Sequence, residues 1–169
     1  MDNRITIRTA KDKKDAQNLA ALAREIWTEH YTPIIGAEQV EYMLEKFQSE
    51  EAIFNQINSE GYIYYMAFCE GKLAGYLSIK PDETTKQVFL SKLYVEKNFR
   101  KKGIAKEFIN MLKSLYYKPQ FDCIWLTVNK NNKGSIAAYK KLGFRIADEM
   151  VTDIGNGFVM DDYKMSLEL

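Results

Sequence analysis

The stretch "YIYYMAFCEGKLAGYLSIKP" in the middle of the chain restricts the fold more than any other part of the sequence. It contains two runs rich in aromatic and β-branched residues, joined by Glu70-Gly71. Such a dipeptide between two strand-like runs is typical of a β-hairpin turn. A third run, "KQVFLSKLYVEK", follows a break at residues 81–85. The three runs together predict an antiparallel meander.

Helical periodicity dominates the chain before this meander. A short alternating stretch at Arg4–Arg8 indicates a strand, and residues 12–30 then carry apolar residues at helical spacing. Residues 37–47 and 50–58 predict two further helices, and "TPIIG" breaks the pattern between the first two helices. The expected inward face of the first helix consists of Leu19, Leu22, Ala23, Ile26 and Trp27.

After the meander, helix and strand patterns alternate. Residues 103–117 and 133–142 predict helices, and strands are expected at residues 123–128, 144–150 and 157–169. A meander followed by a βαβ unit describes an α/β fold with a mixed sheet and helices on its faces. We find no repeat, low-complexity tract or linker, so we expect a single domain over residues 1–169.

Charge is nearly balanced, with 24 Lys and Arg residues against 23 Asp and Glu residues. A basic patch is therefore local, which argues against a general nucleic-acid binder. The charged first residues lack the apolar core of a secretory signal, and no apolar run approaches the ~20 residues that span a bilayer. Cys69 and Cys123 lack metal-ligand spacing and suit free core thiols. We expect a cytoplasmic protein without a metal or a membrane partner.

One local basic patch lies in "NFRKKGIAKEF", residues 98–108, where a strand pattern gives way to a helix pattern. A helix N-terminus exposes unpaired N–H groups and positive partial charge, so small residues there let an anion approach the backbone. Gly103 and Ala105 are small, and the surrounding charges come from Arg100, Lys101, Lys102 and Lys106. The patch predicts a phosphate site, with a solvated lysine-rich helix start as the alternative.

Two common phosphate loops do not fit this patch. A P-loop requires Gly-Lys-Ser/Thr, whereas Gly103 is followed by Ile104 and Ala105. A dinucleotide fingerprint requires three glycines after the first strand of a βαβ unit, and the stretch has only Gly103.

The pattern that does fit is Arg100-x-x-Gly103-x-Ala105, which resembles the (Gln/Arg)-x-x-Gly-x-(Gly/Ala) motif of the GCN5-related N-acetyltransferases. A second motif follows in the expected order. "LTVNKNNKGSIAAYKKLGF" resembles the family's strand followed by Asn-x-x-(Ala/Ser)-x-x-x-Tyr-x-x-x-Gly-Phe, at Asn132, Ser135, Tyr139, Gly143 and Phe144. The resemblance covers nearly the whole chain.

The resemblance implies a fold in which the strand ending at Val95 and the strand at residues 123–128 are parallel neighbours that splay apart. It implies acetyl-coenzyme A as co-substrate, with its pantetheine arm paired to a strand edge like an added strand. The backbone of Leu93, Tyr94 and Val95 would hold that arm and the acetyl carbonyl. The pyrophosphate would be held by Arg100, Lys101, Lys102, Gly103, Ile104, Ala105 and Lys106, and the second helix would contribute Asn132 and Ser135.

Tyr139 is the expected catalytic residue. In direct acyl transfer an amine attacks the thioester, and the leaving thiolate needs a proton or a stabilising charge. A phenol near the sulfur would donate that proton. The alternative is a tyrosine whose ring only packs between helix and sheet.

The acceptor is less constrained. The family commonly builds its acceptor site after the first helix, which places Glu29, His30 and Tyr31 there as candidates, although neighbouring helical residues point in different directions. A water chain or a more distant carboxylate would serve equally well as the general base. The resemblance is greatest to the bacterial diamine and polyamine acetyltransferases. Acidic residues that would attract a polyamine, or face solvent, are Glu25, Glu29, Glu38, Glu41, Asp161 and Asp162.

Other partners stay open at this stage. A protein amino group, at an N-terminus or a lysine, or an aminoglycoside would also accept an acetyl group. A regulatory module that binds acyl-coenzyme A without catalysis would keep the loop and dispense with Tyr139. A nucleic-acid binder would use the basic stretch together with Lys130, Lys133, Lys140 and Lys141. Homodimers are common in the family, and no sequence feature identifies an interface.

Overall fold

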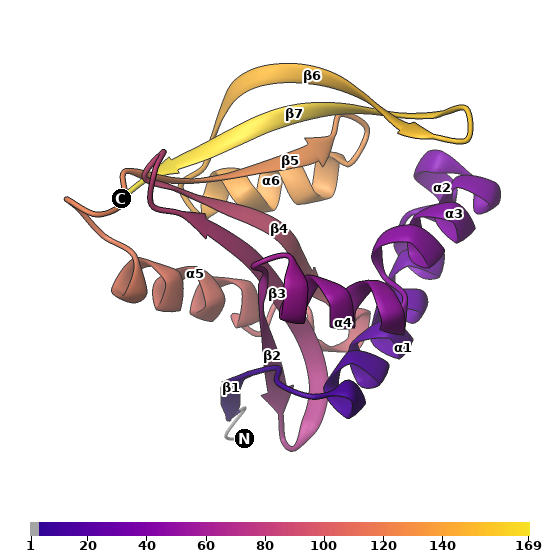
Figure 1. Cartoon of the computed structure of the whole chain (residues 1–169), viewed down its shortest axis with the longest axis horizontal. Helices are drawn as coiled ribbons and strands as arrows, with labels where there is room; N and C mark the ends of the chain where they lie inside the picture. Colours follow the sequence, from indigo (N-terminus) through magenta and orange to yellow (C-terminus); the bar gives the residue numbers. More distant parts are fainter. Residues whose placement is uncertain (1–3) are drawn as a thin grey trace. The chain divides into compact units, whose positions relative to one another are not determined.

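The computed structural model describes residues 4–169 and divides them into two compact units. One unit holds the chain up to Lys80 together with Lys92–Phe108, and the other holds Pro81–Ser91 and Ile109–Leu169. We call them the first and the second unit. Hydrogen-bonded strands follow the order β1-β2-β3-β4-β5-β7-β6, and both parallel and antiparallel pairs occur, so the predicted mixed α/β fold is confirmed (Figure 1).

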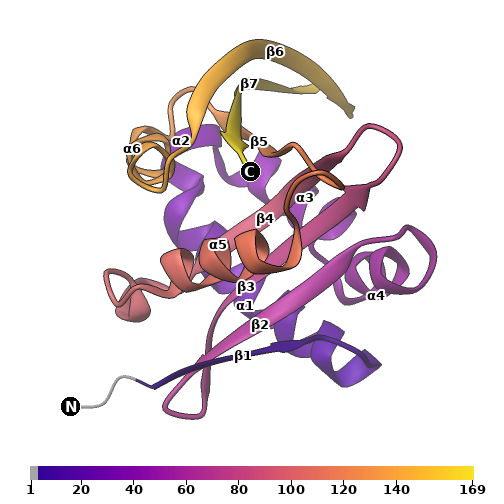
Figure 2. The same ribbon diagram turned by 90° about the vertical axis from the view of Figure 1, so that its left-hand side faces the viewer.

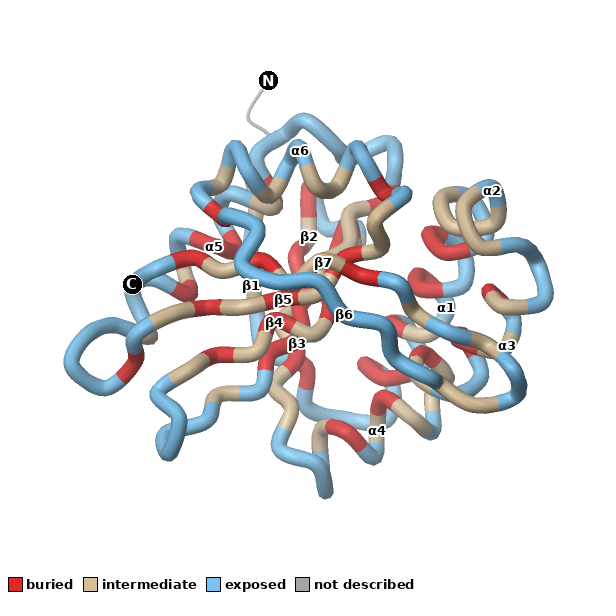
Figure 3. Tube along the Cα trace, turned by 90° about the horizontal axis from the view of Figure 1, so that it is seen from above, coloured by how far each residue is buried: buried red, intermediate tan, exposed pale blue. Residues whose placement is uncertain are grey.

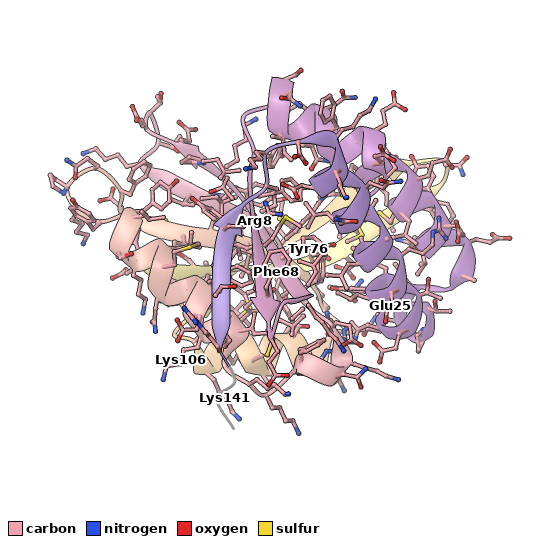
Figure 4. All side chains as sticks on the ribbon, turned by 90° about the horizontal axis from the view of Figure 1, so that it is seen from below. Arg8, Glu25, Phe68, Tyr76, Lys106 and Lys141 are labelled. Carbon is pink, nitrogen blue, oxygen red and sulfur yellow. The ribbon has the colours of Figure 1, made fainter. Side chains whose placement is uncertain are left out.

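The first unit contains the antiparallel strands and four helices. β1 (Ile5–Thr9) pairs with β2 (Ile63–Cys69), and β2 pairs with β3 (Lys72–Asp82), all antiparallel. Figure 2 shows these three strands side by side. On β1, the Arg8 guanidinium lies 5.3 Å from the centre of the Phe68 ring of β2 (Figure 4).

The hairpin between β2 and β3 forms at the predicted dipeptide. Glu70 and Gly71 have φ values of 53° and 80°. Two consecutive positive φ values are those of a type I′ turn, whose twist matches that of the flanking strands. The following strand, β4 (Gln87–Val95), completes the meander.

The first helix, α1 (Lys13–His30), begins at Asp12, whose side chain accepts a hydrogen bond from the Asp15 N–H at 2.8 Å. Its expected inward face is confirmed, because all five of those residues are buried. In the same unit, α1 contacts α3 (Ala37–Phe47) and α4 (Glu50–Ser59), both close to their predicted bounds.

"TPIIG" differs from the prediction. It forms a helical turn, α2 (Thr32–Ile35), in place of a simple break. Pro33 falls in the first turn, where its missing N–H is tolerated, and Gly36 ends the turn with a φ of 87°. Proline therefore starts a new helix here and does not only end the old one.

The second unit contains the parallel pair. The beginning of β4 lies parallel to β5 (Cys123–Asn129), with Gln87 opposite Cys123 and Phe89 opposite Trp125. The last strand, β7 (Phe158–Glu168), pairs with β5 and with β6 (Arg145–Gly155), antiparallel to both. β6 is longer than predicted, and its residues 145–153 are exposed (Figure 3).

The remaining helices are α5 (Ile104–Leu115), which has residues in both units, and α6 (Lys133–Lys141) in the second unit. A short 3₁₀ turn, η1 (Lys97–Phe99), precedes α5. None of the helices in residues 4–169 combines the length and apolar character that crossing a membrane requires. Both cysteines are free thiols; Cys69 is buried as expected, whereas Cys123 is only half-buried, because it lies on the face of β5 whose residues are all half-buried.

Candidate functional site

In the first unit, the loop between β4 and α5 carries the predicted phosphate-binding residues. Glu96 is buried and shapes the loop, since its carboxylate accepts hydrogen bonds from the Asn98 N–H at 3.0 Å and the Asn98 amide at 3.2 Å. The Glu96 N–H in turn donates to the Ala74 carbonyl at 2.8 Å. The start of the loop is thereby fixed to β3.

Gly103 ends this loop, and its carbonyl accepts the hydrogen bond of the Glu107 N–H at 2.9 Å, as the residue before a helix does. Its φ is 87°, a conformation that glycine adopts without strain. A Cβ built at Gly103 would meet nothing within 4 Å, so the space in front of this backbone is open. Lys101 also has a positive φ, of 63°. This geometry fits an anion in close contact with the backbone.

The side chains around Gly103 divide into two kinds. Arg100, Lys101, Lys102 and Lys106 are exposed, and Lys106 is labelled in Figure 4. Ile104 is buried, with 2% of its surface exposed, so its side chain packs in the interior. The Lys102 ammonium lies 5.6 Å from the centre of the Phe99 ring.

Arg100 joins residues that the sequence places in two different sites. Its Nε donates to the Val95 carbonyl at 3.0 Å, and its Nη2 donates to the Glu29 carboxylate at 3.2 Å. Val95 is a predicted cofactor residue, and Glu29 is a predicted acceptor residue. No sequence pattern indicated this ion pair, since the two charged residues are 71 positions apart.

An aromatic cluster lies beside this pair in the first unit. Trp27 stacks on Tyr31 with ring centres 4.2 Å apart, and Tyr94 meets both rings, at 5.7 and 6.2 Å. Tyr76 of β3 (Figure 4) lies 5.4 Å from Tyr94. His30 contacts Tyr31 edge to face at 4.9 Å. The structure therefore brings the acceptor candidate Tyr31 to the cofactor candidate Tyr94.

Gly75 helps to position the backbone of the candidate site, and the sequence analysis did not identify it. A Cβ at this position would lie 2.7 Å from the Tyr94 carbonyl oxygen and 3.4 Å from the Val95 Cα. A glycine is therefore required for β3 and the end of β4 to approach this closely. The signal in the sequence was a glycine inside an otherwise continuous strand pattern.

Lys92 was also missed. It precedes Leu93 on β4 and is 5% exposed, and its ammonium donates to the Phe47 carbonyl at 2.5 Å, the Tyr64 hydroxyl at 2.5 Å and the Gln56 amide oxygen at 3.2 Å. The Tyr64 hydroxyl also donates to Gln56. Burial, opposed by the charge of Glu60, lowers the pKa of Lys92 to about 7. The end of β4 is thus supported by a buried polar cluster.

In the second unit, the predicted second motif shapes α6. The Asn132 side chain is buried and accepts a hydrogen bond from the Ser135 N–H at 3.3 Å, which caps the helix. Tyr139 is half-buried, and its ring lies 5.7 Å from that of Phe144. Gly143 has a φ of 105°, and a Cβ there would lie 3.0 Å from Leu167. These contacts give the motif a structural role, and the expected cofactor and acid roles stay predictions.

The acidic residues expected to attract a polyamine are distributed over both units. Glu25 (labelled in Figure 4) and Glu38 are exposed, and Glu41 pairs with Arg24 at 2.6 Å. A groove of about 370 Å³ in the first unit is lined by Ala20, Ala21, Arg24, Glu41, Leu44, Glu45, Gln48, Ser49 and Glu50. In the second unit, Asp161 is exposed and pairs with Lys130 at 2.9 Å.

Asp162 does not face solvent, which was the alternative to attracting a polyamine for the acidic residues. It is 5% exposed, and its Oδ1 forms no hydrogen bond with any of residues 4–169. Burial is the largest cause that raises the pKa of its carboxyl, to about 6. In the same described part of the chain, no group of three or more His, Cys, Asp or Glu side chains could hold a metal ion.

The sequence matches known proteins along most of its length. The model of the acetyltransferase (GNAT) family matches residues 18–144. An uncharacterised N-acetyltransferase of Lactobacillus delbrueckii is 22% identical over 150 residues, which cover 85% of this chain and 87% of that protein. The spermidine N(1)-acetyltransferase of Thermoplasma acidophilum is 26% identical over 152 residues, with 88% and 91% covered.

Solved structures share the fold. The PaiA N-acetyltransferase of Thermoplasma acidophilum, solved in complex with coenzyme A, has a TM-score of 0.82 at 24% identity, with 98% of this chain and 99% of that chain covered. A GCN5-related N-acetyltransferase of Rhodopseudomonas palustris has a TM-score of 0.79 at 19% identity, with 97% and 95% covered.

Proposed function

Because the chain belongs to the acetyltransferase (GNAT) family, we propose that it transfers the acetyl group of acetyl-coenzyme A directly to a primary amine. The observation that carries this proposal is the open backbone at Gly103, where a positive φ and an empty space within 4 Å are surrounded by exposed cationic side chains. A polyanion fits this surface, and a pyrophosphate is the polyanion of the co-substrate.

The first unit would bind the co-substrate through two elements. The N–H groups at the start of α5, with Arg100, Lys101, Lys102 and Lys106, would hold the pyrophosphate, and the backbone of Leu93, Tyr94 and Val95 would pair with the pantetheine arm. The position of this backbone is supported by the buried Lys92 and by the close approach at Gly75. The proposed co-substrate site is therefore formed by β3, β4 and the loop between β4 and α5.

Tyr139, in the second unit, would donate the proton that the leaving thiolate requires. Its ring is held by Phe144, and Asn132 and Ser135 fix the start of the helix that carries it. Family resemblance supports this role, since Tyr139 occupies the tyrosine position of the second motif.

We infer that the acceptor is a diamine or polyamine. Two of the similar proteins support this choice by their names, the spermidine N(1)-acetyltransferase of Thermoplasma acidophilum and the spermidine N-acetyltransferase of Vibrio cholerae in complex with coenzyme A and spermine. In this chain, Glu29, His30 and Tyr31 would line the acceptor side, where aromatic faces and a carboxylate both favour cations.

Four further properties complete the proposal. The chain would act as a single catalytic domain over residues 1–169, and without a metal. Two free thiols fit a reducing cytoplasm. The chain would form a homodimer, since homodimers are common in the family.

An amine panel tests the proposal. The protein is incubated with acetyl-coenzyme A and one amine at a time, namely spermidine, spermine, a short diamine, an aminoglycoside and peptides with a free N-terminus or lysine, and free thiol is followed. We expect the greatest kcat/KM with a polyamine or diamine. Tight binding of acetyl-coenzyme A without thiol release for any amine would favour a regulatory module. A preference for the peptides would make the protein a protein acetyltransferase.

A further inference from the structure

Of the four cationic side chains that the loop between β4 and α5 would offer to a pyrophosphate, only that of Arg100 is paired with a carboxylate. Its Nη2 donates to Glu29 at 3.2 Å. The other three, Lys101, Lys102 and Lys106, form no ion pair within the described part of the chain. An anion of the chain itself therefore occupies the guanidinium that a phosphate would use.

Glu29 lies where a carboxylate is unfavourable for its own helix. It is the next-to-last residue of α1, so it stands beside the negative end of the helix dipole. Arg100 is its only cationic partner among residues 4–169, and 41% of the Glu29 side chain is exposed. If Arg100 paired with another anion, an accessible carboxylate would remain beside a negative helix end. A cation from solution would then be favoured at this place.

The contacts of Arg100 allow such a change of partner. Its Nε donates to the Val95 carbonyl at 3.0 Å, while Nη2 holds Glu29. A guanidinium has five N–H donors, so a new partner at the outer nitrogens requires no loss of the bond to Val95. The Arg100 side chain is 37% exposed, so a ligand can approach it. Phosphate oxygens match the guanidinium fork and carry more charge than one carboxylate.

Aromatic rings at the end of α1 suit an incoming ammonium group. Tyr31 stacks on Trp27 at 4.2 Å and meets Tyr94 edge to face at 6.2 Å. The faces of such rings attract cations. Tyr94 directly precedes Val95, so these rings adjoin the contact between Arg100 and β4. A carboxylate, a helix end and ring faces in this part of the first unit all favour positive charge.

We propose that Arg100 exchanges Glu29 for the pyrophosphate of acetyl-coenzyme A, and that the released carboxylate then binds an ammonium group of the acceptor. One ion pair within the protein is replaced by two ion pairs with ligands, and no covalent bond changes. This inference rests on the proposed acetyl transfer and adds a coupling between its two substrates. Each substrate makes the binding site of the other more favourable.

The exposure of the pair sets the size of this coupling. Breaking an exposed ion pair changes a binding constant by up to about fivefold. The amine should therefore bind up to about fivefold more tightly once the pyrophosphate has taken Arg100. Because coupling between two binding sites is reciprocal, the amine should raise the affinity for coenzyme A by the same factor.

The first test measures the coupling by titration calorimetry with spermidine and coenzyme A, which has no acetyl group to transfer. The Kd of spermidine is determined with and without saturating coenzyme A at constant ionic strength. Wild type should show a ratio of about two to five, and Glu29→Gln a ratio of about one. Glu25→Gln, which changes an exposed glutamate of the same helix, should keep the ratio of wild type.

Three results of this test would overturn the inference. They are a ratio of one in wild type, a failure of wild type to bind spermidine in either state, and an undiminished ratio in Glu29→Gln. The last result would mean that the amine is attracted directly by the phosphates of coenzyme A.

A second variant gives a change of opposite sign to that expected from damage to the fold. Arg100→Met removes the partner of Glu29, so spermidine should bind up to about fivefold more tightly without coenzyme A, while coenzyme A binds more weakly. A damaged fold would weaken both ligands. Unchanged or weaker binding of spermidine would overturn the inference while the acetyl transfer still stands. Wild-type protein that does not bind coenzyme A would overturn both the proposed function and this inference.

Discussion

The guanidinium of Arg100 ties the end of β4 to the end of α1, because one of its nitrogens donates to the Val95 carbonyl and another to the Glu29 carboxylate. Arg100 therefore contacts one residue of the predicted cofactor site and one residue of the predicted acceptor site, both in the first unit. Both charged groups of the Arg100–Glu29 pair are partly exposed, at 37% and 41%, so the pair itself contributes only about 0.2–1 kcal/mol to stability.

Glu29→Gln should change the binding of acetyl-coenzyme A and the binding of the amine in opposite directions. The change removes the charge that competes with a phosphate for Arg100, so the Kd for acetyl-coenzyme A should fall by up to about fivefold, which corresponds to ~1 kcal/mol. The KM for a cationic amine should rise. Titration calorimetry and steady-state kinetics measure the two effects. The control is Glu25→Gln, an exposed glutamate on the same helix; an equal effect there would point to general surface charge.

Gly103→Glu should abolish binding of acetyl-coenzyme A, since it places bulk and negative charge in the open space before the helix start. The backbone conformation adds a separate cost of roughly 1 kcal/mol for any side chain at a φ of 87°. Gly103→Ala carries that cost without the charge, so it is the matched control. We expect Gly103→Ala to be slightly less stable and to retain most of its affinity. Equal affinity for Gly103→Glu and wild type would place the phosphates elsewhere.

Tyr139→Phe should lower kcat by about 10²-fold or more, the lower end of the range for an acid that protonates a leaving group. The Kd for acetyl-coenzyme A should change little, because phenylalanine keeps the ring contact with Phe144. Thiol release under saturating substrates and direct cofactor titration measure the two quantities. An unchanged kcat would remove Tyr139 from the mechanism.

Lys92 gives a prediction for stability against pH. Its pKa is about 7 in the folded protein and near 10.5 when exposed, so between these values the unfolded chain binds one more proton than the folded one. The contribution of Lys92 to the free energy of unfolding should therefore rise by roughly 1.4 kcal/mol per pH unit between pH 7 and 10.5 and be flat below pH 7.

Lys92→Met tests this by difference. Urea unfolding is measured at pH 6, 7, 8 and 9. The free energy of unfolding of wild type minus that of the variant should increase by about 2–3 kcal/mol between pH 7 and pH 9. Lys80→Met is a suitable control, since Lys80 is exposed. Parallel curves for wild type and Lys92→Met would mean that the ammonium is not desolvated.

Local features were predictable from sequence. The Glu70-Gly71 turn, the buried face of α1 and the glycine at the start of α5 each depend on residues a few positions apart, and each is confirmed. Such features follow from backbone conformation and periodicity, which neighbouring residues determine.

Long-range features were not predictable in the same way. Lys92 donates to a carbonyl 45 residues away, and Arg100 reaches a carboxylate 71 residues away. The burial of Asp162 depends on strands on either side, and an aspartate in an alternating strand gives no sign of which face it occupies. Residues whose chemistry depends on tertiary partners therefore required the structure.

The close approach at Gly75 has a consequence for directed evolution of this protein. An added Cβ would collide with the carbonyl of Tyr94, so β3 and β4 would have to separate before any larger residue could be accepted there. In the proposed function the aromatic rings around Tyr94 lie on the acceptor side, so libraries that vary these rings would test new acceptors. A library that varies position 75 would mostly sample displaced strands. A residue without a side chain thus limits which substitutions this pair of strands can accept.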